Sequence, residues 1–270
     1  REYRGKAMAS RQFWSGLAAV ASGGVTGFVL GYFEAPLSYA MIFFISGGVM
    51  SLSFFAFGTV REPKKTQFAR QENSFGKFLG SALHVLQHDK LLRRQISSRL
   101  LSYTFLLAMP FVVLQAKTNF GLTGKDVGIF VSMQMGGGML SNLLWGRLSG
   151  RNRNKLIVLF SYIFVLVGFS LALFPVSIHI YYAVFFLAGA SIDGFRLAFQ
   201  HLVLIIAPEE QRATYVAIQN NIASLGLFFS LPGGLLLDAL GFRPLVYITL
   251  VLLVLGFVLS LRLKWKCQVS

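Results

Sequence analysis

Eight apolar stretches dominate this sequence, and each is long enough to cross a lipid bilayer as a helix. A helix rises about 1.5 Å per residue, so about 20 apolar residues cross a hydrocarbon core of about 30 Å. Charged residues make up only 13% of the chain, against about 25% in a soluble domain. We predict an all-α integral membrane protein, a polytopic bundle of eight transmembrane helices at roughly 12–33, 36–60, 96–117, 124–146, 155–174, 180–206, 212–237 and 242–263.

The basic residues are distributed unevenly between the connections. Every second connection and the two ends of the chain, counted with Arg99 just inside the span that follows residues 61–95, hold all but four of the 25 lysines and arginines. Three of the exceptions, Lys117, Lys125 and Arg243, lie on the opposite side, and Arg196 lies within a span. Basic connections stay in the cytoplasm, so we expect both termini there, in a plasma (inner) membrane with anionic headgroups at the cytoplasmic face. The scattered charge argues against a nucleic-acid partner despite the net charge of +15.

The longest polar connection, residues 61–95, divides residues 1–60 from residues 96–270. Its apolar residues recur at helical spacing, which predicts an amphipathic helix on the cytoplasmic membrane face. His84 and His88 are four residues apart on that helix, a spacing that suits a metal ion. Because no third ligand is nearby, we favour a solvated helix face, and we expect no metal and no cofactor.

A weak internal repeat links the two ends of the chain. Residues 2–9 resemble residues 210–217, and Pro36-Leu37-Ser38-Tyr39 resembles Pro244-Leu245-Val246-Tyr247 at the same spacing. The first two spans therefore look like a second copy of the last two, and duplicated halves are common in transporters. If each half has six helices, residues 1–60 are the last two of an N-terminal half and residues 96–270 are a complete C-terminal half. The chain is then a fragment.

The loop from Trp145 to Lys155 resembles the G-x-L-x-D-R-x-G-R-K loop of the major facilitator superfamily. The positions that fit are Gly146, Leu148, Arg151 and Lys155. Gly150 and Arg153 stand where the family has its Asp and second Gly, so the acidic part of the loop is missing. The segments 208–212 and 61–63 resemble the family's link between helices ten and eleven and its exit from helix six.

This resemblance implies helices five to twelve of a twelve-helix secondary transporter that works by alternating access. In the family, the loop helps to close the cytoplasmic side through charge contacts. The gate residues it implies here are Gly146, Arg147, Arg151, Arg153, Lys155 and Arg212. The family's antiporter signature fits poorly, because only Gly23 and Gly24 of residues 15–24 match it. The subfamily, and symport or antiport, stay open.

Asp193, Arg196 and Gln200 are the polar residues at the centre of the sixth span. Their i, i+3, i+7 spacing puts them on one helix face, and charges at that depth cost several kcal/mol unless they are paired or wetted. Three interpretations remain open. In the first, Arg196 holds Asp193 ionised until substrate or a movement separates them, and Asp193 then takes up a proton. In the second, Arg196 holds an anionic group of the cargo. In the third, the two residues form a static pair.

Further amides mark other candidate positions along the substrate path. Gln134 precedes Gly136-Gly137-Gly138, which serve either as a bend point or for tight helix packing. Gln115 follows Pro110, which is expected to kink the third span. Gln219, Asn220 and Asn221 cannot all face one way on a helix, so at least one should bond a neighbouring helix. We expect Asn220 or Asn221 to line the path.

These features favour a secondary active transporter of a small organic solute, with protons as the candidate coupling ion. The alternative is a non-transporting membrane sensor or assembly partner with a transporter fold. An enzyme is not expected, because the sequence has no H-E-x-x-H, no G-x-S-x-G and no pair of intramembrane acids.

Overall fold

The computed structural model describes residues 2–59, 80 and 84–262, and of residues 2–13 and 210 the backbone only. Within this part of the chain, eight helical segments are long and apolar enough to cross a membrane, which confirms the eight predicted spans. Six of them are single helices: α1 (Glu2–Tyr32), α2 (Leu37–Gly58), α6 (Gly124–Gly150), α7 (Asn154–Ala172), α8 (Ile178–Ile206) and α11 (Phe242–Leu261).

The third and seventh spans are each broken by a short 3₁₀ segment. The third consists of α4 (Lys90–Ser102), η1 (Tyr103–Leu107) and α5 (Met109–Phe120), and the seventh of α9 (Arg212–Ser224), η3 (Leu225–Phe229) and α10 (Ser230–Leu240). A further short turn, η2 (Glu209–Gln211), precedes α9. The break in the third span ends just before Pro110, in the first turn of α5, where its missing N–H costs nothing. The two breaks meet: a Cβ at Gly226 would lie 2.5 Å from Cβ of Tyr103.

The third span begins earlier than predicted, at Lys90. Asp89 caps α4, because its Oδ1 accepts hydrogen bonds from the backbone N–H groups of Leu91 (2.8 Å) and Leu92 (3.0 Å). The last residues of the predicted linker are therefore part of this helix. Residues 84–88 are helical, but most of the predicted amphipathic helix lies outside the described residues and stays a prediction.

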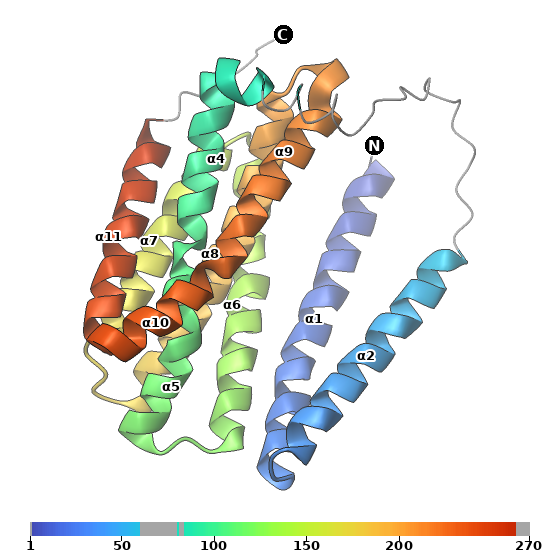
Figure 1. Cartoon of the computed structure of the whole chain (residues 1–270). Coiled ribbons are helices and arrows are strands. Elements are labelled where there is room, and N and C mark those ends of the chain that lie inside the picture. The colour runs from blue at the N-terminus through green and yellow to red at the C-terminus, as the bar shows by residue number, and fades with distance from the viewer. Residues whose placement is uncertain (1, 60–79, 81–83, 263–270) are drawn as a thin grey trace.

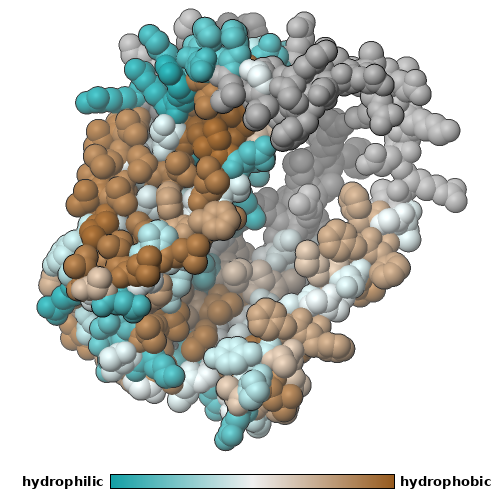
Figure 2. All heavy atoms as spheres, in the orientation of Figure 1, coloured by the Kyte–Doolittle hydropathy of each residue, from teal (hydrophilic) through white to brown (hydrophobic). Residues whose placement is uncertain are grey.

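Helices α4 to α11 form one body, and α1 and α2 stand beside it (Figure 1). Its core is aromatic: Phe130 of α6 stacks on Phe185 of α8 with ring centroids 4.7 Å apart. Tyr162 of α7 donates its hydroxyl to the backbone carbonyl of Ser98 on α4 at 2.6 Å. Apolar side chains cover much of the outside of this body, and hydrophilic ones gather at the end where α4 begins (Figure 2). This distribution suits a bundle set in lipid.

Helix α1 joins the body through glycine contacts with α6. A Cβ at Gly27 would lie 3.1 Å from Cα of Gly128, and a Cβ at Gly23 would lie 2.7 Å from the backbone nitrogen of Ser132. Small residues four apart on both helices let the two backbones approach closely, as is common in membranes. Helix α2 packs on α1, and its large apolar side chains are exposed. In the space-filling view the surface is hollowed between α2 and the larger body (Figure 2).

Candidate functional site

The charged pair predicted in the sixth span is formed near the middle of α8. Nη2 of Arg196 lies 3.0 Å from Oδ1 of Asp193. The side chain of Asp193 is 21% exposed and that of Arg196 is 64% exposed, so the carboxylate lies against the protein while the guanidinium extends outward. The helix continues to Ile206 and ends before Pro208, since the residue that precedes a proline favours an extended backbone.

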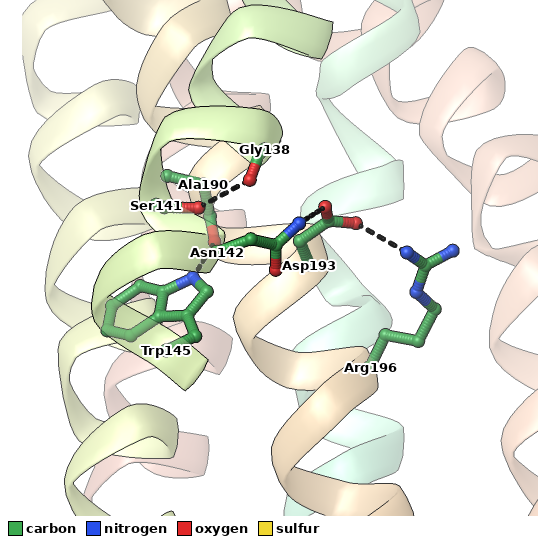
Figure 3. A network of polar contacts seen from close by, with 7 residues as sticks. All are labelled: Gly138, Ser141, Asn142, Trp145, Ala190, Asp193 and Arg196. Atoms are coloured by element: carbon green, nitrogen blue, oxygen red, sulfur yellow. Dashed lines mark hydrogen bonds and ion pairs between the residues drawn. The ribbon is translucent and has the colours of Figure 1, made fainter. Parts of the chain in front are cut away.

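A second helix also holds the carboxylate. Asn142 of α6 donates from Nδ2 to Oδ2 of Asp193 at 2.7 Å. Figure 3 shows Asn142 and Arg196 reaching Asp193 from opposite sides. Each carboxylate oxygen therefore has its own partner, one charged and one neutral. Asn142 was not among the predicted residues, although an amide at mid-span is itself a signal of interhelical bonding.

Glycines bring α6 and α8 close enough for this bond. A Cβ at Gly137 would meet the backbone of Phe186, and a Cβ at Gly138 would lie 2.9 Å from Oδ2 of Asp193. Just beyond them, Trp145 donates from Nε1 to the carbonyl of Ala190 at 3.1 Å. Helix α6 is unbroken from Gly124 to Gly150, and Gly137 and Gly138 allow tight packing on α8; a role of the glycine run as a bend point stays a prediction.

Two of the predicted path residues, Gln200 and Gln134, lie on the same helices as this network. Among the described residues, neither forms a hydrogen bond to it. Gln200 is exposed on α8, one turn beyond Arg196. Gln134 is half-buried about two turns from Asn142 along α6, or about 12 Å, and its backbone carbonyl faces Gly189 of α8. Their contact with a solute stays a prediction.

A second polar cluster lies where α4, α8 and α9 meet. Arg99 of α4 donates from Nη1 to Oδ1 of Asn220 at 2.9 Å, and Gln219 donates from Nε2 to the carbonyl of Phe199 at 3.1 Å. These bonds confirm that at least one amide of the seventh span bonds a neighbouring helix. Asn221 is exposed. Arg99 lies inside the third span, as predicted, about 13 Å from Lys90 along the helix.

Comparison with known proteins agrees with this architecture. The model of the Major Facilitator Superfamily matches residues 1–231 and 100–266. The chain belongs to the Major Facilitator Superfamily. No curated protein matches the sequence at a significant level.

Two solved structures of transporters of this superfamily resemble the chain. One is a bacterial homologue of the iron transporter ferroportin in an inward-facing state, with TM-score 0.61 and 19% identity over 91% of this chain and 59% of that one. The other is a bacterial homologue of the human lysosomal transporter Spinster, with TM-score 0.52 and 14% identity over 95% of this chain and 69% of that one. The chain thus spans less than two thirds of the ferroportin homologue. Its assignment to helices five to twelve stays a prediction.

The gate loop expected from the superfamily is short. Gly146 and Arg147 belong to the last turns of α6, and Arg151–Arg153 alone connect α6 to α7. Lys155 donates from Nζ to the carbonyl of Leu261 at 2.8 Å, so it caps the end of α11. Arg212 pairs with Glu209 of its own connection at 3.2 Å. Both basic residues have local structural partners, and their role in closing a superfamily transporter stays a prediction.

The remaining candidates lie at the two ends of the body. Gln115 donates to Asn119 at 3.1 Å, and Asn119 donates to the hydroxyl of Tyr181 at 3.2 Å, which ties α5 to α8 far from the charged pair. The rings of His84 and His88 stack with centroids 4.1 Å apart. Among the side chains that the structure describes, no three His, Cys, Asp or Glu residues are grouped as a metal site would require.

Proposed function

We propose that this chain belongs to a secondary active transporter of a small organic solute, and that Asp193, Asn142 and Arg196 form its coupling site with protons as the coupling ion. The observation that carries the proposal is a partly exposed carboxylate near the middle of a transmembrane helix, held by one partner on its own helix and one on α6. Ionisable groups at that depth are costly and are typical of ion and proton pathways.

Protonation of Asp193 changes both of its contacts. A neutral carboxylic acid no longer forms an ion pair, so it releases Arg196, whose side chain is already largely exposed. Asn142 still has an acceptor oxygen, but its bond is no longer charge-assisted and is weaker. The proton therefore frees a guanidinium and loosens the contact between α6 and α8 in one step. This coupling of proton binding to helix contact is what proton-driven alternating access requires.

The wider arrangement supports the same proposal. Helix α6 lies between α1 and α8 and meets each of them through glycines, on separate faces. The same helix, α6, thus makes the contact between Asn142 and Asp193 and the contact between Gly128 and Gly27 of α1. A change at the first contact can therefore reach the second through α6. We further propose that the ends carrying Lys155 and Arg212 face the cytoplasm, at an anionic membrane surface.

The test uses the full-length transporter reconstituted in proteoliposomes. A thermal-shift screen across small organic solutes first identifies a solute that stabilises the protein. Uphill uptake of that solute is then driven by an inward proton gradient, and exchange is measured without a gradient. Asp193→Asn should abolish uphill uptake and leave exchange intact, whereas Asp238→Asn, which removes an exposed carboxylate from the end of α10, should leave both intact.

Two outcomes would count against the proposal. Uphill uptake that survives in Asp193→Asn would remove Asp193 from the coupling step. Solute binding with neither uptake nor exchange in the unmodified protein would favour a sensor with a transporter fold.

A further inference from the structure

Arg99 is a buried cation without an acidic partner among the residues that the structure describes. It is 8% exposed, and its hydrogen bond to Asn220 joins it to a neutral amide. Within the part of the chain that the structure describes, the ion pairs are Arg196 with Asp193 and Arg212 with Glu209. Asp89, the acid on the same helical segment, accepts from the hydroxyl of Tyr215 and from the first turn of α4.

A buried guanidinium without an acidic partner lacks both a counter-charge and acceptors for most of its N–H groups. Arginine stays protonated at any physiological pH and presents five N–H donors in a plane that matches a carboxylate or phosphate. Removing such a charge from water is costly unless an opposite charge accompanies it. One bond to a neutral amide supplies neither the charge nor a second acceptor.

The layer below Arg99 also has unfilled acceptors. Gln95 and Gln219 both donate from Nε2 to the carbonyl of Phe199, at 3.2 and 3.1 Å. Their Oε1 atoms are buried and have no hydrogen-bond partner in the described part of the chain. Buried amide oxygens are normally satisfied, so this cluster does not complete its own hydrogen bonding. It has capacity for both an acceptor at Arg99 and donors beside it.

Arg99 lies at the same depth as the charged pair of α8. From the layer of Gln95, Phe199 and Gln219, Arg99 is about 6 Å further along α4, and Arg196 is about 4.5 Å further along α8 in the same direction. The negative charge of Asp193 balances the positive charge of Arg196, and the positive charge of Arg99 has no counter-charge among the described residues. When Asp193 takes a proton, both are uncompensated, so protonation and anion binding reinforce each other.

We propose that Arg99 and Asn220 bind the anionic group of the transported solute, a carboxylate or a phosphate. The role of the ligand as cargo rests on the proposed transport function, whereas the anion site itself rests on Arg99 and the polar residues around it. It assigns the solute to the organic anions, and it makes proton and anion bind cooperatively on neighbouring helices. The arrangement favours symport of the two.

The first experiment measures ligand-induced thermal shifts of the full-length protein in phosphatidylcholine nanodiscs. Matched probes separate the anionic group from the rest of the molecule: lactate against lactamide, succinate against succinamide, and glycerol 3-phosphate against glycerol. We expect stabilisation by acids and not by their neutral counterparts. Removal of the guanidinium in Arg99→Gln should weaken binding about tenfold or more. Arg243→Gln, the same change at an exposed position, should not weaken it.

A second variant keeps the proposal testable if Arg99→Gln does not fold. Asn220→Asp places a carboxylate on the existing partner of Arg99, so the protein supplies its own counter-charge. We expect this variant to melt at a higher temperature than the unmodified protein and to lose its response to acids. A variant with an unchanged melting temperature and an intact response would overturn the assignment.

The remaining outcomes separate this inference from the proposed function. Equal stabilisation by acids and amides would refute anion recognition, whatever the behaviour of Asp193→Asn in uptake. Stabilisation by phosphatidylglycerol nanodiscs, with no response to soluble anions, would make Arg99 a lipid site and overturn its role in cargo binding. Acid binding that depends on Arg99, with uphill uptake unaffected by Asp193→Asn, would keep the anion site and discard the coupling site.

Discussion

Nδ2 of Asn142 lies 2.7 Å from Oδ2 of Asp193, so a hydrogen bond to a carboxylate joins α6 to α8 inside the span. Oδ1 of the same carboxylate is held by Arg196 of α8 itself. One group thus connects the helix that packs on α1 with the helix that carries the charged pair. The consequences of breaking this connection can be measured separately for stability and for transport.

Replacing Asn142 by Leu removes the donor while keeping a side chain of similar size. Interhelical hydrogen bonds in membranes are worth about 0.6 kcal/mol on average and up to about 1.7, and a bond to a carboxylate belongs at the upper end. We expect the free energy of unfolding to fall by about 1–2 kcal/mol and proton-driven uptake to fall more than exchange. Ser141→Ala provides the comparison, because that hydroxyl bonds to Gly138 within α6. Equal effects of the two variants would refute a special role for Asn142.

The three adjacent glycines of α6 should respond differently to alanine. A Cβ at Gly137 meets the backbone of Phe186, which cannot move aside without separating the helices, and one at Gly138 meets the carboxylate of Asp193. A Cβ at Gly136 meets nothing within 4 Å. Alanine is favoured over glycine in a helix by about 1 kcal/mol.

Gly136→Ala should therefore be neutral or stabilising, Gly137→Ala strongly destabilising, and Gly138→Ala mainly harmful to transport. Melting temperature and uptake, measured on the same preparations, check this order. If Gly136→Ala instead abolished transport while preserving the melting temperature, the glycine run would act as a hinge after all.

The features that could be predicted from the sequence are those set by the residues of a single helix. Length and apolarity suffice to locate a span, and i, i+3 spacing suffices to pair Asp193 with Arg196. The bond from Asn142 could not be predicted, because it depends on how close α6 lies to α8 and on which face it presents. The position of Arg99 inside the third span follows from the sequence, but its bond to Asn220 could not be predicted, because it depends on how α4 packs against α9.

The glycines of α1 provide a third prediction. Gly23 and Gly24 are adjacent, but a Cβ at Gly23 meets the backbone of Ser132, whereas one at Gly24 meets nothing within 4 Å. Gly23→Ala should weaken the packing of α1 on α6, and Gly24→Ala should not. Pairs of cysteines placed in α1 and α6 on a cysteine-free background would report the packing through cross-linking yield. Similar yields in both variants would show that α1 is not held by this contact.

The membrane orientation can be tested with single cysteines. Residues 1–270 hold one cysteine, Cys267, so Cys267→Ser, with any cysteine outside these residues also replaced, gives a background without thiols. Val176 is 87% exposed in the connection between α7 and α8, and an added Cβ at Gly150, at the end of α6, meets nothing within 4 Å. Both positions should accept cysteine without disturbing the fold.

The distribution of basic residues predicts that position 176 lies outside and position 150 in the cytoplasm. A membrane-impermeant maleimide added to intact cells should therefore label Val176→Cys and leave Gly150→Cys unlabelled until the cells are permeabilised. The reverse pattern would place the connection with Arg151 and Arg153 outside. Because Lys155 and Arg212 lie at that same end of the body, the reverse pattern would also exclude their proposed role at a cytoplasmic gate.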